Sequence, residues 1–179
     1  FPYTTLFRSG LGNVSAFTFA DDNTIYALSE QLMQVVIGQG SFTYSAVVEE
    51  QVNAGYIGCA DGKVYYSDSE LFGARQIYVV DPKTGDTDVF ADGTRLYISR
   101  GGQYMAIVND AVAAGKQDGN ALAIADLKTG AITPVEDVET VSGLSWSVDE
   151  SKLYYSIPTT AGDFPNKLMQ YDIASAQVA

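Results

Sequence analysis

A serine in the stretch GLSWS, residues 143–147, comes near the Gly-x-Ser-x-Gly motif that presents the nucleophile of many hydrolases. A serine hydroxyl needs a neighbouring base to accept its proton, usually histidine. The chain has no histidine, the motif lacks its second glycine, and a strand pattern follows where a helix would be required. We therefore predict that Ser145 is not catalytic and that Trp146 packs between neighbouring sheets.

Two other features could carry chemistry. Residues 81–88, DPKTGDTD, superficially suggest a calcium loop, but Lys83 and Gly85 stand where Asp or Asn is needed and no closing Glu follows. Cys59, the single cysteine, lies in the apolar stretch YIGCA and has no histidine to activate it, so we expect a buried core thiol. The sequence thus predicts no catalytic residue, no metal and no cofactor.

The composition points to an all-β protein. Of 179 residues, 46% are apolar, and 12 Tyr and 8 Phe stand against a charged fraction of only 18%. Aromatic rings pack well on the half-buried surface of a sheet. Twenty-two acidic and 10 basic residues give a net charge of −12, which repels nucleic acid and anionic lipids. No stretch approaches the roughly twenty apolar residues of a membrane span.

A repeat of about 45 residues organises the chain. Residues 77–85 (IYVVDPKTG) and 122–130 (LAIADLKTG) are two copies, and residues 168–176 (LMQYDIASA) are a degraded third. Each copy is an apolar strand, an Asp and a tight turn. An Asp at this place accepts hydrogen bonds from the next backbone amides, and Gly closes the hairpin. We therefore expect Asp81 and Asp126 to form equivalent turns.

A second recurring unit, strand, polar turn and strand, precedes each copy. It occurs at residues 17–27, 56–66, 96–106 and 144–155. Together the two units predict four antiparallel strands in each of about four blades, at roughly 14–49, 53–91, 95–136 and 140–179. This is a β-propeller or a piece of one. The first blade lacks the Asp-Lys-Thr-Gly turn, and we expect Gly38 and Gly40 to serve there.

Residues 144–155, LSWSVDESKLYY, resemble the "SWSPDGKKIAF" signature of WD-like repeats. Such repeats form the TolB propeller and the amino-terminal propellers of prolyl-oligopeptidase-type peptidases. Val148 replaces the usual Pro, and Glu150 and Ser151 replace the Gly. Residues 78–85 and 123–130 resemble the "lyvvDlktGk" hairpin of the same repeats. The resemblance covers about 165 residues and implies a bacterial periplasmic, cell-surface or secreted protein, or the propeller of a larger enzyme.

The opening FPYTTLFRSG does not join the repeat pattern. It resembles the peptide obtained when sequencing-adapter sequence is translated, and we interpret residues 1–12 as a non-native or linker-like leader. The chain is expected to be an excerpt of a longer protein.

Long loops suggest where a partner would bind. We call the four strands of each blade A to D in chain order. The B–C connections of the second, third and fourth blades are long, at residues 68–75, 109–120 and 158–167, and antiparallel order sends them to one side of their blades. The candidate partner-binding residues are Leu71, Phe72, Arg75, Lys116, Asp118, Asp163 and Phe164.

Three functions fit this pattern. The first is a non-catalytic module that binds a protein or peptide. The second is the gating propeller of a prolyl-oligopeptidase-like peptidase whose hydrolase domain lies elsewhere. The third, a lyase or lactonase acting at a central channel, is disfavoured because the chain has no histidine. The oligomeric state is not predicted.

Overall fold

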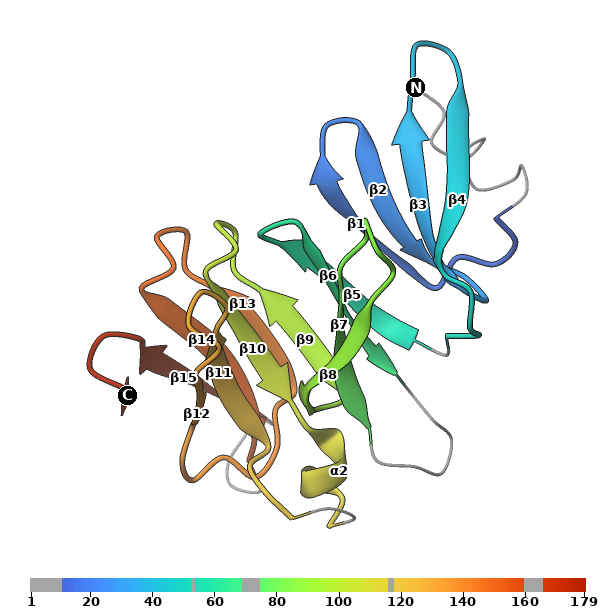
Figure 1. Ribbon diagram of the computed structural model, residues 1–179. Helices are drawn as coiled ribbons and strands as arrows, with labels where there is room; N and C mark the ends of the chain where they lie inside the picture. The colour runs from blue at the N-terminus through green and yellow to red at the C-terminus, as the bar shows by residue number, and fades with distance from the viewer. Residues whose placement is uncertain (1–10, 53, 69–74, 116–117, 160–165) are drawn as a thin grey trace. The chain divides into compact units, whose positions relative to one another are not determined.

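The computed structural model describes residues 11–52, 54–68, 75–115, 118–159 and 166–179. In these residues the chain forms four sheets, each of four antiparallel strands, and a single helical turn (Figure 1). Within every sheet the strands are neighbours in the same order as in the chain. Consecutive hairpins of this kind make a blade, so the all-β, four-bladed prediction is confirmed. The chain divides into two compact units, residues 1–92 and residues 93–179.

The first unit contains two blades. The strands of blade 1 are β1 (Ala16–Asp21), β2 (Thr24–Leu28), β3 (Leu32–Ile37) and β4 (Phe42–Val48). The strands of blade 2 are β5 (Ala54–Ala60), β6 (Lys63–Asp68), β7 (Gln76–Val80) and β8 (Thr87–Asp92).

The second unit contains the other two blades. The strands of blade 3 are β9 (Arg95–Ile98), β10 (Tyr104–Val108), β11 (Leu122–Asp126) and β12 (Ile132–Pro134). The strands of blade 4 are β13 (Gly143–Trp146), β14 (Lys152–Pro158), β15 (Asn166–Asp172) and β16 (Gln177–Val178). The helical turn α2 (Asp110–Ala113) lies between β10 and β11.

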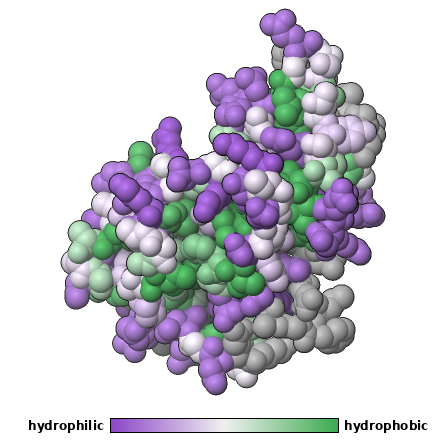
Figure 2. Space-filling model, in the orientation of Figure 1, coloured by the Kyte–Doolittle hydropathy of each residue, from purple (hydrophilic) through white to green (hydrophobic). Residues whose placement is uncertain are grey.

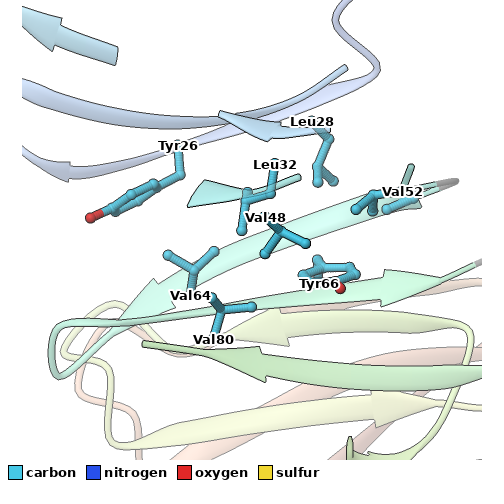
Figure 3. Packing of buried hydrophobic residues seen from close by; sticks show 9 residues of the cluster. Tyr26, Leu28, Leu32, Val48, Val52, Val64, Tyr66 and Val80 are labelled. Carbon is cyan, nitrogen blue, oxygen red and sulfur yellow. The ribbon is translucent and has the colours of Figure 1, made fainter. Parts of the chain in front are cut away.

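Blades 1 and 2 share a core built from alternate residues of their strands. Because side chains alternate across a strand, β2 turns Tyr26 and Leu28 towards this core. Facing side chains from the two blades fill it (Figure 3). They include Tyr26, Leu28, Leu32 and Val48 of blade 1 and Val64, Tyr66 and Val80 of blade 2. Each fully buried aliphatic or aromatic side chain contributes about 1.5–3 kcal/mol.

Blades 3 and 4 share a core of the same construction. Its buried residues include Val108, Leu122, Leu153 and Tyr155. Trp146 of blade 4 packs against this cluster, donates Nε1–H to the carbonyl of Tyr97 at 2.8 Å and stacks on Tyr104 with ring centroids 6.1 Å apart. The prediction that Trp146 packs between blades is confirmed.

The turns that end the repeats have the predicted chemistry. Asp81 Oδ1 accepts the Lys83 amide at 2.9 Å, and Asp126 Oδ1 accepts the Lys128 amide at 2.9 Å. Gly85 and Gly130 close these turns with φ of 79° and 76°, where a side chain would strain the backbone. In the degraded third copy, Asp172 Oδ1 likewise accepts the Ser175 amide at 2.9 Å.

The turn of blade 1 also follows the prediction. Gly38 donates its amide to the carbonyl of Ser41 at 2.9 Å, and Gly40 has a left-handed φ of 77°. These two glycines replace the Asp-Lys-Thr-Gly turn of the later blades.

Two details differ from the sequence-based expectation. Pro158, Asn166 and Lys167 were expected in a loop, but Pro158 pairs with Asn166 and Ile157 with Lys167, so β14 and β15 are longer than predicted. A polar residue fits at the end of a strand when its backbone completes the ladder. Cys59 is half-buried against the core of the first unit rather than fully buried.

Candidate binding loops

The structure describes two of the seven predicted binding residues. Arg75 and Asp118 are exposed and lie in different units. The other five, Leu71, Phe72, Lys116, Asp163 and Phe164, lie outside the described residues. The loop that the structure describes best is the B–C connection of blade 3, residues 109–121.

This loop begins with a fixed helical turn. Asn109 is buried, with 5% of its surface exposed, and takes the extended conformation of a helix N-cap. Its Oδ1 accepts the amide of Ala111 at 3.1 Å. Its own amide donates to the carbonyl of Ala121 at 3.0 Å, which brings the two ends of the loop together. The loop therefore leaves the sheet from a rigid base (Figure 1).

Asp110, the first residue of α2, is held by two residues at the start of β9. Arg95 donates Nε–H to Oδ2 of Asp110 at 2.9 Å and an NH2 proton to Oδ1 at 2.7 Å. Thr94 accepts the Asp110 amide at 3.0 Å, and its hydroxyl lies 2.8 Å from Oδ2. A two-pronged arginine–carboxylate pair fixes orientation as well as distance.

The same arginine reaches a second segment. The NH2 group of Arg95 donates to the carbonyl of Val141 at 2.7 Å, in the crossover that leads from blade 3 into blade 4. Burial lowers the pKa of Arg95, but the hydrogen bonds with Asp110 and Tyr97 outweigh burial and raise it overall. The guanidinium thus stays charged and joins the loop base to the crossover on one side of the second unit.

Small residues form the exposed part of the helical turn above this base. In the described part of the loop, Ala113, Ala114 and Gly115 are exposed. Across all described residues, no three His, Cys, Asp or Glu side chains gather closely enough to hold a metal ion. The described part of this turn is therefore small and weakly apolar, and it starts from a hydrogen-bonded base.

Sequence reasoning did not single out Thr94 and Arg95. Their partner Asp110 lies 15 residues away from Arg95, and nothing in the local sequence links the two. The helical turn had a signal, since Asn-Asp followed by Ala-Val-Ala-Ala is a helix cap before good helix formers.

The opposite side of the second unit has a groove of about 260 Å³ lined by Tyr104, Asp126, Thr129 and Tyr171, among others. Its carboxylate is already engaged, because Asp126 Oδ1 accepts the amides of Lys128 and Thr129 at 2.9 and 3.0 Å. The volume is also below that of usual ligand pockets, which measure roughly 300–1,000 Å³. We do not assign a ligand to this groove.

The two potential nucleophiles are poorly placed for reaction. Ser145 lies within β13 opposite Tyr154 of β14, and the chain turns directly into that next strand. Burial, together with the charge of Asp21, raises the pKa of Cys59 and keeps the thiol protonated at neutral pH.

The comparisons with known proteins bear on the fold alone. No protein-family model matches the sequence, and no curated protein matches it. Among solved structures, TolB from Acinetobacter baumannii superposes on 93% of this chain with a TM-score of 0.59 at 13% identity. The structure titled as a putative TolB from Agrobacterium tumefaciens also covers 93% of this chain, with a TM-score of 0.59 at 19% identity. The β-propeller domain of the Trilobed protease from Pyrococcus furiosus covers 70% with a TM-score of 0.54 at 19% identity.

The fold is that of a β-propeller. The chain spans 43% and 61% of the lengths of the two TolB chains, and 41% of the protease propeller. In the described part of this propeller, no helix has the length and apolar character needed to cross a membrane.

Proposed function

We propose that this propeller chain is a non-catalytic binding module of a bacterial secreted or envelope protein, and that it recognises a protein or peptide through its long B–C loops. The observation that carries the proposal is the fixed base of the loop at residues 109–121. Three side chains, Thr94, Arg95 and Asp110, hold the start of that loop. A loop that is ordered before binding loses less entropy when a partner docks.

We base the assignment to an envelope or secreted protein on analogy with the TolB chains that share this fold. The strongly acidic composition supports a partner that is neutral or basic. Hydrophilic side chains cover much of the visible surface, with apolar ones between them (Figure 2).

The test is a selection of peptides from a random displayed library on the immobilised chain. Selected peptides are then measured against the double variant Phe72→Ser with Phe164→Ser, and against Ala113→Glu. We expect the double variant to lose about 2 kcal/mol or more of binding free energy if these rings are anchors. The exposed A–B turn variant Val148→Glu is the control, since Val148 is 82% exposed.

Binding that all three loop substitutions leave unchanged would contradict the loop assignment. Selection of no peptide at all would contradict the binding function.

A second function is favoured by the protease propeller. The chain would then be the gating propeller of a prolyl-oligopeptidase-like peptidase, and its hydrolase domain would be encoded in the same gene. The sequence of the complete gene separates the two functions: a downstream α/β-hydrolase pattern supports the peptidase, and its absence supports the binding module.

A further inference from the structure

The last strand of each blade is an edge of its sheet, and the four edges differ in how they are protected. Natural proteins protect edge strands with charges, prolines, bulges or short length, because an open edge can pair with another chain. Strand β8 carries Asp88 and Asp92, β12 has three residues and ends in Pro134, and β16 has two residues.

Strand β4 lacks these protections. Its seven residues, FTYSAVV, include no charge and no proline, and the one irregularity in its pairing with β3 lies at the far end, beside Leu32. Residues 42–46 are all exposed, with Phe42 at 45% and Tyr44 at 49%. The other edge of the sheet, β1, lies beside β5, whereas no strand among the described residues pairs with the outer side of β4, so β4 is the open edge of blade 1 in this part of the chain (Figure 1).

The backbone of this edge is available for pairing. Within the described residues, no backbone hydrogen bond other than those to β3 reaches residues 42–46. In an edge strand, alternate N–H and C=O groups point away from the sheet. Blade 2 covers the Val48 end of β4. Gly85 of blade 2 lies against the carbonyl of Val47, and a Cβ added to this glycine would be 3.0 Å from the carbonyl oxygen. The open stretch is thus about five residues, or roughly 17 Å of strand.

The two faces of the edge set what could pair there. Phe42 and Tyr44 share the face of Ile37 and Val35, while Thr43 and Ser45 point to the other face. An added strand with apolar side chains at every second position would extend the aromatic face and place polar side chains beside Thr43 and Ser45.

Charge defines the partner further. Residues 1–92 hold 12 acidic and 4 basic side chains, a net charge of −8. Exposed Glu49 and Glu50 follow directly after β4, and Asp86 adjoins Gly85 at its covered end. A basic strand is attracted to such an edge, whereas a second copy of a chain with net charge −12 is repelled.

We propose that β4 is a strand-addition site that takes an extended, basic peptide segment of a partner protein as a fifth strand of blade 1, with alternate apolar residues against Phe42 and Tyr44. Main-chain hydrogen bonds supply affinity in this mode, and alternate side chains supply specificity. The site is separate from the loop at residues 109–121 and does not depend on the function proposed for it.

The experiment uses the full chain and a labelled synthetic peptide, Lys-Val-Thr-Val-Thr-Val-Lys, in a fluorescence anisotropy titration at low salt. Two peptides test the mode: one with proline at the central valine, which cannot complete the ladder, and one with Glu in place of Lys. We expect saturable binding of the first peptide and at least about tenfold weaker binding of the other two.

Substitutions in the protein locate the site. Tyr44→Lys and, as a second choice if that variant misfolds, Ser45→Lys are expected to weaken binding by about tenfold or more. The matched control is Val89→Lys on the edge strand β8, where Val89 is 52% exposed; it should change affinity less than about twofold.

Several results would overturn the proposal. They are absence of saturable binding, equal binding of the proline peptide, equal effects of the β4 and β8 substitutions, and a β4-dependent dimer in sedimentation velocity in place of peptide binding. Normal peptide selection by the loops together with failure here would leave the proposed function standing and remove only the β4 site.

Discussion

Glu150 occupies a position where the repeat signature has a Gly, and it keeps the backbone conformation that a glycine would adopt, with φ of 60°. This conformation costs a non-glycine residue about 1 kcal/mol or more. The side chain offsets the cost by crossing to blade 3. Its carboxylate accepts the amide of Gly101 and, at 3.0 Å, the hydroxyl of Ser99. The departure from the signature therefore joins two blades.

Replacing Glu150 should separate these two effects. Glu150→Ala keeps the strain and loses both hydrogen bonds, so we expect a loss of about 1–3 kcal/mol in the free energy of unfolding. Glu150→Gly loses the same bonds but relieves the backbone, so its loss should be smaller by about 1 kcal/mol. Urea unfolding measures both. The control is Asp137→Gly, at an exposed residue with φ of 59°, which should not destabilise the protein. Equal stability of Glu150→Ala and the wild type would show that the inter-blade bonds contribute nothing.

Ser145 belongs to a near match of a hydrolase motif, but it lies in a strand. Its neighbours across the hairpin are strand residues, and the chain has no histidine, the usual base for a serine nucleophile. We expect the purified chain to show no hydrolysis of fluorogenic ester or peptide substrates above background, and Ser145→Ala to alter at most stability. Hydrolysis that disappears in this variant alone would refute the assignment.

Among the connecting elements, the loop at residues 109–121 has a base held by the side chain of Arg95. Arg95 donates to both the Asp110 carboxylate and the carbonyl of Val141, so its loss removes the hydrogen bonds that connect these two segments through one side chain. The positions of the loop base and of the crossover should therefore change together.

Arg95→Met is expected to lower the free energy of unfolding by about 1.5–3 kcal/mol, the range for hydrogen bonds to charged groups. Hydrogen exchange of the amides at residues 110–115 should speed up more than exchange in β10 and β11. Arg100→Met, at an exposed residue of the neighbouring β9–β10 turn, is the matched control and should be near neutral. Uniform acceleration across blade 3 would mean that Arg95 supports the whole blade and not the loop in particular.

The molecule as a whole combines an acidic surface with buried tyrosines in both units. Burial raises the pKa of all five: Tyr26, Tyr65, Tyr66, Tyr155 and Tyr171. Burial is the main cause at Tyr66, with the charge of Asp68 adding to it, and its pKa rises from 10.0 to about 12. A neutral form favoured by folding stabilises the protein fully below the unfolded pKa, and this contribution is lost as the pH rises through the folded pKa.

We therefore expect the free energy of unfolding to decrease as the pH rises from about 10 to about 12. In the Tyr66→Phe variant it should decrease less steeply over that range. Urea midpoints across this window provide the measurement. Tyr155→Phe gives a useful contrast below pH 10, because no described group bonds the buried Tyr155 hydroxyl. Its removal should be neutral or stabilising. A Tyr66→Phe profile parallel to that of the wild type would exclude Tyr66 as a source of the alkaline loss.

Strand positions and turns followed from the sequence because both are set by neighbouring residues. Short apolar runs between polar turns, as in β2, β6 and β14, predict strands. The Asp-to-amide bonds and left-handed glycines of the turns span two to four residues, so the repeats at residues 77–85 and 122–130 predicted them. Even the packing of Trp146 between blades could be anticipated from the repeat.

Contacts between distant residues were beyond such reasoning. The bonds from Arg95 to Val141 and from Glu150 to Gly101 join residues 46 and 49 positions apart, and many pairings of charged or polar residues were equally compatible with the pattern. The open edge at β4 also needed the structure. A strand's sequence shows that it lacks charges, but whether another strand covers it depends on the order of strands in the sheet.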